Sequence, residues 1–152
     1  MRVALDTNIL AYAEGVNGAE MKRRTLTLLR SLPERSVLVP VQVLGELFAL
    51  LVRKAGRAPA SARRATLGWR DAFSLIDTSH EVILAAFDLA ADHQLRIWDA
   101  VILSASAEGE CRLLLSEDLQ DGFTWKGVTV TNPFRPQKHE LLSSLLEDSS
   151  QS

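Results

Sequence analysis

The chain has 152 residues, of which 47% are hydrophobic and 24% charged, and its single cysteine, Cys111, excludes an internal disulfide. This length suits one globular domain with a buried core, and the formal net charge of −2 excludes a general positive field for nucleic acid. No apolar run is long enough to span a membrane and the N-terminus leads directly into an apolar strand, so we expect a cytoplasmic protein without a signal peptide.

Short apolar runs alternate with longer segments of helical periodicity along the chain. The run at 3–8, closed by Asp-Thr-Asn, predicts a buried strand that leads into a turn and a helix. Strands are predicted at 3–8, 37–39, 73–76, 112–116 and 128–130, and helices at 9–13, 19–32, 41–54, 60–70, 81–93 and 99–108. This alternation predicts right-handed crossovers, and therefore an α/β fold with a central, mostly parallel sheet of four to five strands.

The regular alternation ends near residue 135. We therefore expect one domain over residues 1–135, followed by a tail over residues 136–152 that is partly helical or disordered. The tail is polar and rich in serine, although its leucines can dock a last helical turn or a partner.

Four acidic residues stand at the ends of predicted elements: Asp6 after the first strand, Glu46 early in a helix, Asp99 at a helix start and Asp118 after the fourth strand. In an open parallel sheet these positions can meet at one edge. Without a counter-charge the carboxylates would repel one another, and some would retain protons. Mg²⁺ or Mn²⁺ removes that conflict and leaves positions for a phosphate oxygen and a water. The pattern therefore predicts metal-assisted hydrolysis of a phosphodiester.

The segments around these acids carry a family resemblance. In chain order they read VALDTNIL, VLGELF, WDAVILSASAEGE and RLLLSEDLQDG. Together they resemble PIN-domain ribonucleases, and in particular the VapC-type toxins of bacterial toxin–antitoxin pairs. The resemblance extends from Val3 to about Phe134, which makes residues 1–135 the PIN domain.

The resemblance implies a PIN-like three-layer α/β/α sandwich that cleaves RNA endonucleolytically with Mg²⁺, or Mn²⁺ in its place. It further implies a homodimer, inhibited by a small antitoxin protein whose C-terminal segment lies across the site. The metal-binding and catalytic acids would be Asp6, Glu46, Asp99 and Asp118, supported through hydrogen bonds by Asn8 and Ser116. Many members carry another aspartate two places after the fourth acid, whereas here Gln120 occupies that place and Asp121 follows as an auxiliary candidate.

A stretch rich in arginine lies between residues 53 and 70 and contains no acid. Such a stretch either contacts the phosphates of an RNA or forms a solvated helical face. Its members are Arg53, Lys54, Arg57, Arg63, Arg64 and Arg70. Trp98, next to Asp99, is able to wall the site or stack on a base, but we expect it to pack in the core.

Two alternatives remain open from the sequence. A phosphohydrolase would use Asp6 as its nucleophile. Asn8 argues against that role, because haloacid-dehalogenase-like enzymes carry a second aspartate at this place. A non-catalytic PIN-fold module would bind RNA or a protein partner, yet such a module has no need for four acids at one edge. Dinucleotide binding is excluded, since no glycine-rich loop follows the first strand.

Overall fold

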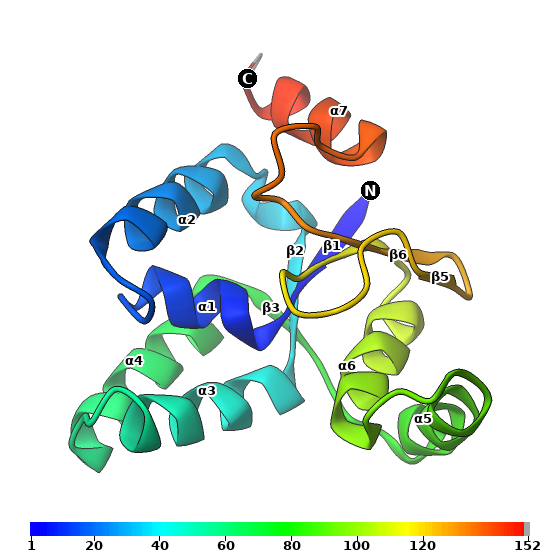
Figure 1. Cartoon of the computed structure of the whole chain (residues 1–152), viewed down its shortest axis with the longest axis horizontal. Coiled ribbons are helices and arrows are strands. Elements are labelled where there is room, and N and C mark those ends of the chain that lie inside the picture. The colour runs from blue at the N-terminus through cyan, green and yellow to red at the C-terminus, as the bar shows by residue number, and fades with distance from the viewer. Residues whose placement is uncertain (151–152) are drawn as a thin grey trace.

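A six-stranded sheet with the order β3-β2-β1-β4-β6-β5 forms the centre of the computed structural model, which describes residues 1–150 and side chains up to residue 148 (Figure 1). Neighbouring strands are parallel, except that β5 and β6 are antiparallel. The strands are β1 (Arg2–Leu5), β2 (Val37–Pro40), β3 (Ser74–Ile76), β4 (Cys111–Leu115), β5 (Thr124–Trp125) and β6 (Val128–Thr131).

The strand number corrects the prediction of four to five. The additional strand is β5, which lies between the predicted strands at 112–116 and 128–130. Two residues are too few to show the alternation by which a strand is recognised in a sequence. Pairing with β6 makes this segment a strand, with Thr124 opposite Thr129 and Trp125 opposite Val128.

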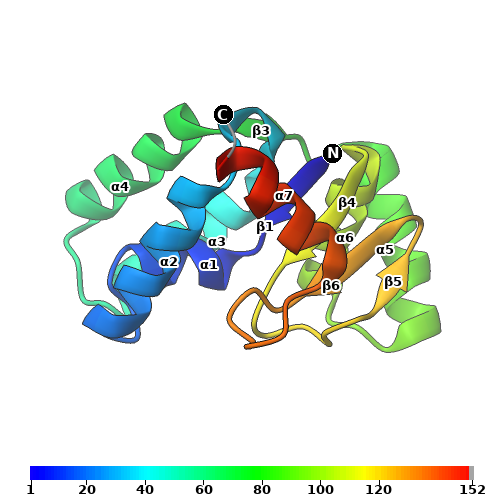
Figure 2. The ribbon, with the colours of Figure 1, turned by 90° about the horizontal axis from the view of Figure 1, so that it is seen from above.

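Helices cover both faces of the sheet. Figure 2 shows α1 and α2 on one side of the strands and α5 and α6 on the other, which confirms the predicted three-layer α/β/α sandwich. The helices α3 and α4 pack against each other, and α7 contacts α2. The helices are α1 (Thr7–Ala13), α2 (Ala19–Ser31), α3 (Val41–Arg53), α4 (Pro59–Ala72), α5 (His80–His93), α6 (Ile97–Glu108) and α7 (Glu140–Ser150), with the 3-10 turn η1 (Glu34–Ser36) before β2.

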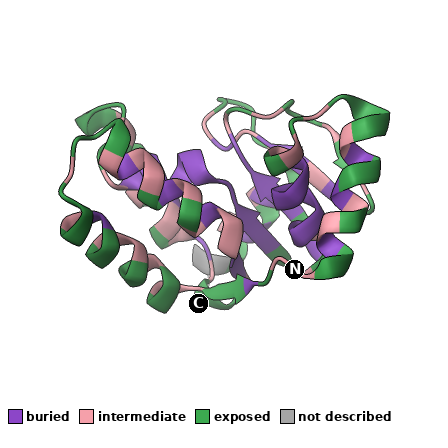
Figure 3. Ribbon diagram, turned by 90° about the horizontal axis from the view of Figure 1, so that it is seen from below, coloured by how far each residue is buried: buried purple, intermediate pink, exposed green. Residues whose placement is uncertain are grey.

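The core lies between the central strands and the helices α1 and α6. All seven residues of α1 are buried, as are seven consecutive residues of α6, and Figure 3 shows the buried residues gathered at the centre of the molecule. A helix that is apolar around most of its circumference is typical of the interior. By contrast, α4 fully buries only Ala62. The start of α1 and the middle of α6 are therefore packed in the interior.

The sheet order creates a crevice beside β1. From β1 the chain moves to β2 and β3 on one side, and then to β4 and β6 on the other. At such a switch point a crevice opens beyond the carboxyl ends of the strands. The register pairs Leu5 with Leu115, so the following residues, Asp6 and Ser116, lie side by side. The amide of Asp6 extends the ladder by donating to the carbonyl of Leu115 at 3.0 Å.

Two helix ends carry residues that commonly begin or end a helix. The Ser79 hydroxyl caps α5 by accepting a hydrogen bond from the amide of Val82 at 3.2 Å. Gly109 ends α6, and a β-carbon there would lie 2.7 Å from Cδ1 of Ile76, so a larger residue would require the Ile76 side chain to shift.

The C-terminal segment forms α7, which buries Leu142 and Leu145 against the rest of the core. Residues 151–152 of the predicted tail lie outside the described residues. Within the part of the chain that the structure describes, no helix combines the length and apolar content needed to cross a lipid bilayer.

Candidate functional site

The four predicted acids line one pocket of about 390 Å³ at the carboxyl edge of the sheet. The floor comes from the β1–α1 junction, one wall from α3 and the other from the start of α6 and the loop after β4. On α3 the lining residues recur at the spacing of one helical face. The complete lining is Asp6, Thr7, Asn8, Glu46, Ala49, Leu50, Arg53, Arg96, Asp99 and Asp118.

Asp6 is the most buried of the four acids, with only 4% of its surface exposed. Its Oδ1 accepts a hydrogen bond from the amide of Thr7 at 2.7 Å, which caps the start of α1. Its Oδ2 accepts from the hydroxyl of Ser116 at 2.7 Å and from the amide group of Asn8 at 3.3 Å. The register of β1 and β4 therefore fixes the carboxylate in one orientation.

Asn8 and Ser116 connect Asp6 to the loop that carries Asp118. Asn8 Nδ2 donates to Asp118 Oδ2 at 3.3 Å and to Ser116 Oγ at 3.2 Å, while Asn8 Oδ1 accepts from the amide of Glu117. Ser116 Oγ in turn accepts from the amides of Asp118 and Leu119, each at 3.2 Å. The cap of α1 is Asp6, so the side chain of Asn8 is not needed as a helix cap. It instead links the β1–α1 junction to the loop after β4.

Thr7 holds Glu46, a contact that the sequence analysis missed. The Thr7 hydroxyl donates to Glu46 Oε2 at 2.7 Å and so ties α1 to α3. A threonine after a strand-end aspartate gives no sign in the sequence of a partner 39 positions away. Glu46 and Asp99 are partly buried, whereas Asp118 is exposed at the mouth of the pocket.

The carboxylates raise one another's proton affinity. Burial raises the pKa of Asp6 from 3.8 to about 6, and the charges of Asp99 and Glu46 add to that rise, while hydrogen bonds from Ser116 and Thr7 oppose it. Burial also raises the pKa of Asp99; the charge of Arg96 counteracts this, and that of Asp118 adds to it. The pocket therefore concentrates negative charge in surroundings that disfavour it.

Two arginines line the same pocket without forming an ion pair. Among the described residues, neither Arg53 nor Arg96 has a carboxylate within 4.0 Å. Arg53 belongs to the predicted basic stretch, whereas Arg96, directly before α6, was missed because no other cation stands near it in the sequence. The four acids therefore remain without a salt-bridge partner.

The donor set fits a hard divalent cation. Within the described residues, no three acidic, histidine or cysteine side chains stand close enough to enclose an ion by themselves. Mg²⁺ is commonly bound by one or two carboxylates together with waters and substrate phosphates, so an open arrangement suits it. Asp6 is buried, accepts hydrogen bonds but has no ion-pair partner among the described residues, and has a raised pKa. A bound cation would therefore stabilise the ionised form of this carboxylate most.

Other predicted residues lie elsewhere. Asp121 accepts from the amide of Asn132 at 2.8 Å and contacts Arg135 at 3.4 Å, so it does not line the pocket. Trp98 is 49% exposed, and the expectation that it packs in the core is wrong. Burial by tertiary neighbours cannot be read from one aromatic residue in the first turn of a helix.

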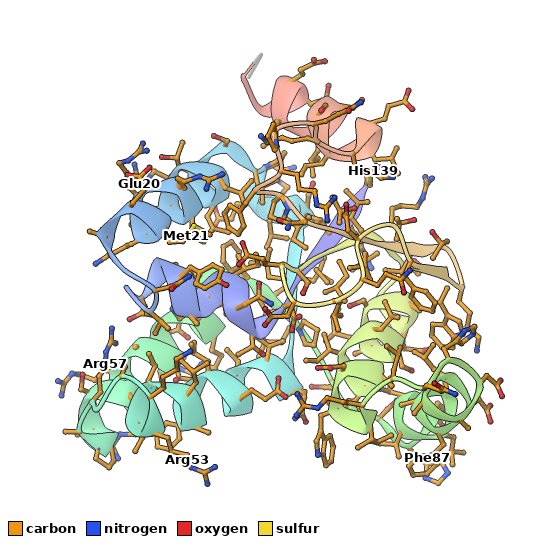
Figure 4. The ribbon with its side chains drawn as sticks, in the orientation of Figure 1. Glu20, Met21, Arg53, Arg57, Phe87 and His139 are labelled. Atoms are coloured by element: carbon orange, nitrogen blue, oxygen red, sulfur yellow. The ribbon has the colours of Figure 1, made fainter. Side chains whose placement is uncertain are left out.

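The members of the basic stretch differ in their contacts and positions. Figure 4 shows Arg53 and Arg57 extending from different parts of the α3–α4 side of the molecule. Arg57 forms an ion pair with Glu14 at 2.7 Å, and Arg70 forms one with its neighbour Asp71 at 2.9 Å. Lys54, Arg63 and Arg64 are exposed and lie outside the pocket, so Arg53 alone of this stretch lines it.

Comparisons with known proteins agree with this architecture. The family model for the PIN domain matches residues 3–121. No curated protein sequence matches the chain. Among solved structures, VapC20 of Mycobacterium tuberculosis, described as a toxin that cleaves the sarcin-ricin loop, has a TM-score of 0.65 and 20% identity, with 76% of this chain and 89% of that chain covered.

Two further structures have similar scores. A toxin–antitoxin complex from Klebsiella pneumoniae has a TM-score of 0.64 and 19% identity, covering 84% of this chain and 95% of that one. FitAcB from Neisseria gonorrhoeae has a TM-score of 0.64 and 17% identity, covering 87% and 98%. At these identities the likeness establishes the fold.

Proposed function

The chain belongs to the PIN domain family, and on that premise we propose that it is a Mg²⁺- or Mn²⁺-dependent endoribonuclease, the toxin of a VapBC-type toxin–antitoxin pair. The observation that carries the proposal is the pocket in which Asp6, Glu46, Asp99 and Asp118 meet without a salt bridge. A site that only bound RNA would be weakened by such charge, because the phosphate backbone is itself negative.

The chain's own residues would divide the work. Asp6, Asp99 and Asp118 would supply ligands to the metal ion together with waters and a substrate phosphate, because no three of the described acids enclose an ion by themselves, and Glu46 would complete the set or orient the attacking water. When bound, the ion supplies Lewis-acid activation of that water and neutralises charge on the phosphate. Asn8 and Ser116 keep Asp6 and Asp118 in fixed positions, and Thr7 does the same for Glu46. Ligands held by such partners keep their geometry as charge develops.

The contacts of Asp6 argue against the phosphohydrolase alternative. Both of its carboxylate oxygens accept hydrogen bonds, and only 4% of the residue is exposed. A carboxylate nucleophile has to approach the phosphorus atom directly, which a side chain with 4% exposure does not permit, whereas a small cation can use the free lone pair of Oδ1, which accepts only one hydrogen bond from the described residues. The geometry suits a metal ligand better than a covalent nucleophile.

An antitoxin and a second copy of the chain complete the proposal. Several structures with this fold are toxin–antitoxin complexes, which supports a small antitoxin protein as partner. Leu84 and Phe87 on α5 are about half exposed, at 50% and 53%, and Figure 4 shows Phe87 at the outer side of the molecule. Such apolar exposure supports a homodimer. Light scattering during gel filtration would measure its mass, and a monomer at micromolar concentration would contradict this part.

The proposal is tested by cleavage of total RNA with purified, antitoxin-free protein in Mg²⁺, in Mn²⁺ and in EDTA. We expect discrete fragments that require the metal and whose ends define the cut. The same assay on Asp99→Asn should give no fragments, because the substitution removes one of the proposed metal ligands.

Asp121→Asn is the matched control, since Asp121 is an acid near the same loop whose contacts point away from the pocket. It should cleave as the wild type does. A fully active Asp99→Asn, or cleavage that persists in EDTA, would contradict the proposal. A well-folded protein that leaves total RNA intact would favour the non-catalytic module.

A further inference from the structure

Arg96 and Arg53 stand on opposite walls of the acidic pocket. Arg53 ends α3, and Arg96 directly precedes α6 and contributes no capping side chain to it. Both side chains are exposed, and neither has an acid within 4.0 Å among the described residues. An arginine beside four carboxylates that pairs with none of them keeps its five donors free for another anion.

Along the wall formed by α3, an acidic residue is followed by apolar residues and then by a cation, an order that suits the parts of a nucleotide. From its N-terminal end the pocket meets Glu46, then Ala49 and Leu50, and then Arg53. Seven residues of helix place Arg53 about 10 Å beyond Glu46 along the axis. If one phosphate is held at the carboxylates, the neighbouring phosphate of the same strand can reach the guanidinium of Arg53. The apolar side chains between the two sites suit a ribose or an unstacked base.

The opposite wall also carries a cation, Arg96, but no apolar residues separate it from the acid Asp99 in the pocket lining. Arg96 lies three residues, about one helical turn, before Asp99, and both residues line the pocket. Arg96 and Asp99 lie close together but form no ion pair among the described residues. The guanidinium of Arg96 therefore lies at the rim of the pocket, beside the proposed metal ligands.

We infer that Arg53 and Arg96 bind the RNA phosphates on either side of the one that is cut, so that a single strand crosses the pocket from α3 to α6. The inference rests on the proposed nuclease function and adds Arg96, which the sequence analysis did not include. Both arginines position the substrate and take no part in the bond-breaking step. Phosphate contacts of this kind fix the register of a nucleic acid without reading its sequence.

The first test measures binding of a labelled single-stranded oligoribonucleotide by fluorescence anisotropy at several KCl concentrations. Asp99→Asn serves as the background, so that the probe is not cut. Adding Arg96→Gln or Arg53→Gln should weaken binding about tenfold at low salt. Each should also lower the slope of log affinity against log salt by about 0.7, the value for one phosphate contact on a single strand. Arg112→Gln, an exposed arginine at the far end of β4, is the control and should change neither quantity.

The second test uses steady-state cleavage in the otherwise wild-type protein. Removing a contact made equally to substrate and transition state raises KM and leaves kcat unchanged, and Arg96→Lys should recover part of the loss by keeping the charge. A lowered kcat with an unchanged KM would instead make Arg96 an organiser of the carboxylates, and would overturn the inference.

A third measurement assigns the contacts to positions on the RNA. A neutral methylphosphonate placed next to the mapped cut should weaken binding to the parent protein at two positions. Arg96→Gln should lose the response at one of them and Arg53→Gln at the other. Variants that respond as the parent does would overturn the inference while leaving the nuclease intact. RNA binding that depends on the arginines in a protein that never cleaves would contradict the proposed function, and with it the placement of the two phosphates on either side of a cut.

Discussion

The two ends of α1 carry carboxylates in opposite circumstances. At its start, Asp6 is buried with the acids Glu46 and Asp99 close enough to raise its pKa, and no cation pairs with it. At its end, Glu14 forms an ion pair with Arg57 at 2.7 Å and accepts a hydrogen bond from the indole of Trp69 at 2.8 Å. The Arg57 guanidinium also donates to the carbonyl of Glu14 at 2.6 Å.

The difference separates an acid with structural partners, Glu14, from the acid that we propose to be functional, Asp6. Around Glu14 every partner supplies positive charge or a donor, so the α3–α4 loop is held against α1. Around Asp6 the partners orient the carboxylate while leaving its charge unopposed by a cation. Such an arrangement costs stability, and proteins retain that cost chiefly where a ligand or a reaction uses it. The predictions below test this contrast.

The largest effect is expected on cleavage. Asp6→Asn should lower the rate more than about 100-fold, since even partners that only support a metal ligand are worth 10- to 100-fold. Glu14→Gln changes the same functional group at the other end of the helix, and should leave the specific activity of the folded protein within about twofold. Initial rates on a defined RNA fragment measure both. Equal losses in the two variants would remove the distinction between the two acids.

The second effect is a pH dependence of stability. Between pH 4 and 6 the folded state holds a proton on Asp6 that the unfolded state has lost, so the free energy of unfolding falls as the pH rises. A pKa raised from 3.8 to about 6 corresponds to about 3 kcal/mol. In EDTA, the wild type should therefore lose up to that amount relative to Asp6→Asn between pH 4 and pH 7.

Urea unfolding at both pH values measures this difference. Asp6→Asn is the reference because it cancels the titration of all other groups. Mg²⁺ at pH 7 should restore stability to the wild type, because the ion competes with the proton for the same oxygens. A difference between the two proteins that stays constant with pH would contradict the unpaired state of Asp6.

The third effect comes from breaking the Glu14 pair. Arg57→Met should lower the free energy of unfolding by about 2 kcal/mol, less than a fully buried pair, because the two side chains remain 27% and 19% exposed. Arg64→Met on the exposed face of α4 should change it by less than about 0.5 kcal/mol. The double variant Glu14→Leu with Arg57→Met should lose less than the sum of the single changes. Strict additivity would show that the pair contributes nothing.

The smallest effect concerns the orientation of Glu46. Thr7→Val keeps the side-chain shape and removes the 2.7 Å hydrogen bond to Glu46, so cleavage should fall about tenfold. The Mg²⁺ concentration for half-maximal activity should rise, which a purely structural defect would not cause. Thr66→Val removes a hydroxyl that bonds only its own helix, and is the matched control. An unchanged requirement for Mg²⁺ would exclude Thr7 as a positioning residue.

Much of this architecture was predictable because its signals are local. The apolar runs of β1, β2 and β4 are buried on both faces, so they stand out as strands without reference to a partner. The helix ends at Ser79 and Gly109 follow from capping chemistry within a few residues. By contrast, β5 is a strand only because it pairs with β6. The exposure of Trp98 depends on how the surrounding elements pack, which the residues next to it in the sequence do not show.

The positions of Asp6, Asp99 and Asp118 could be predicted from the sequence, since each stands close to where an element begins or ends and parallel strands bring such ends together, whereas Glu46 lies in the second turn of α3 and was indicated by the family resemblance. Their partners were decided only by the tertiary structure. Thr7 donates a hydrogen bond to Glu46, and Arg57 donates one to Glu14. Arg96 and Arg53 line the same pocket. Each of these placements depends on the packing of segments that are far apart in the chain. The physical reason is that a hydrogen bond or ion pair is set by distances of a few ångströms, which the order of residues does not encode locally.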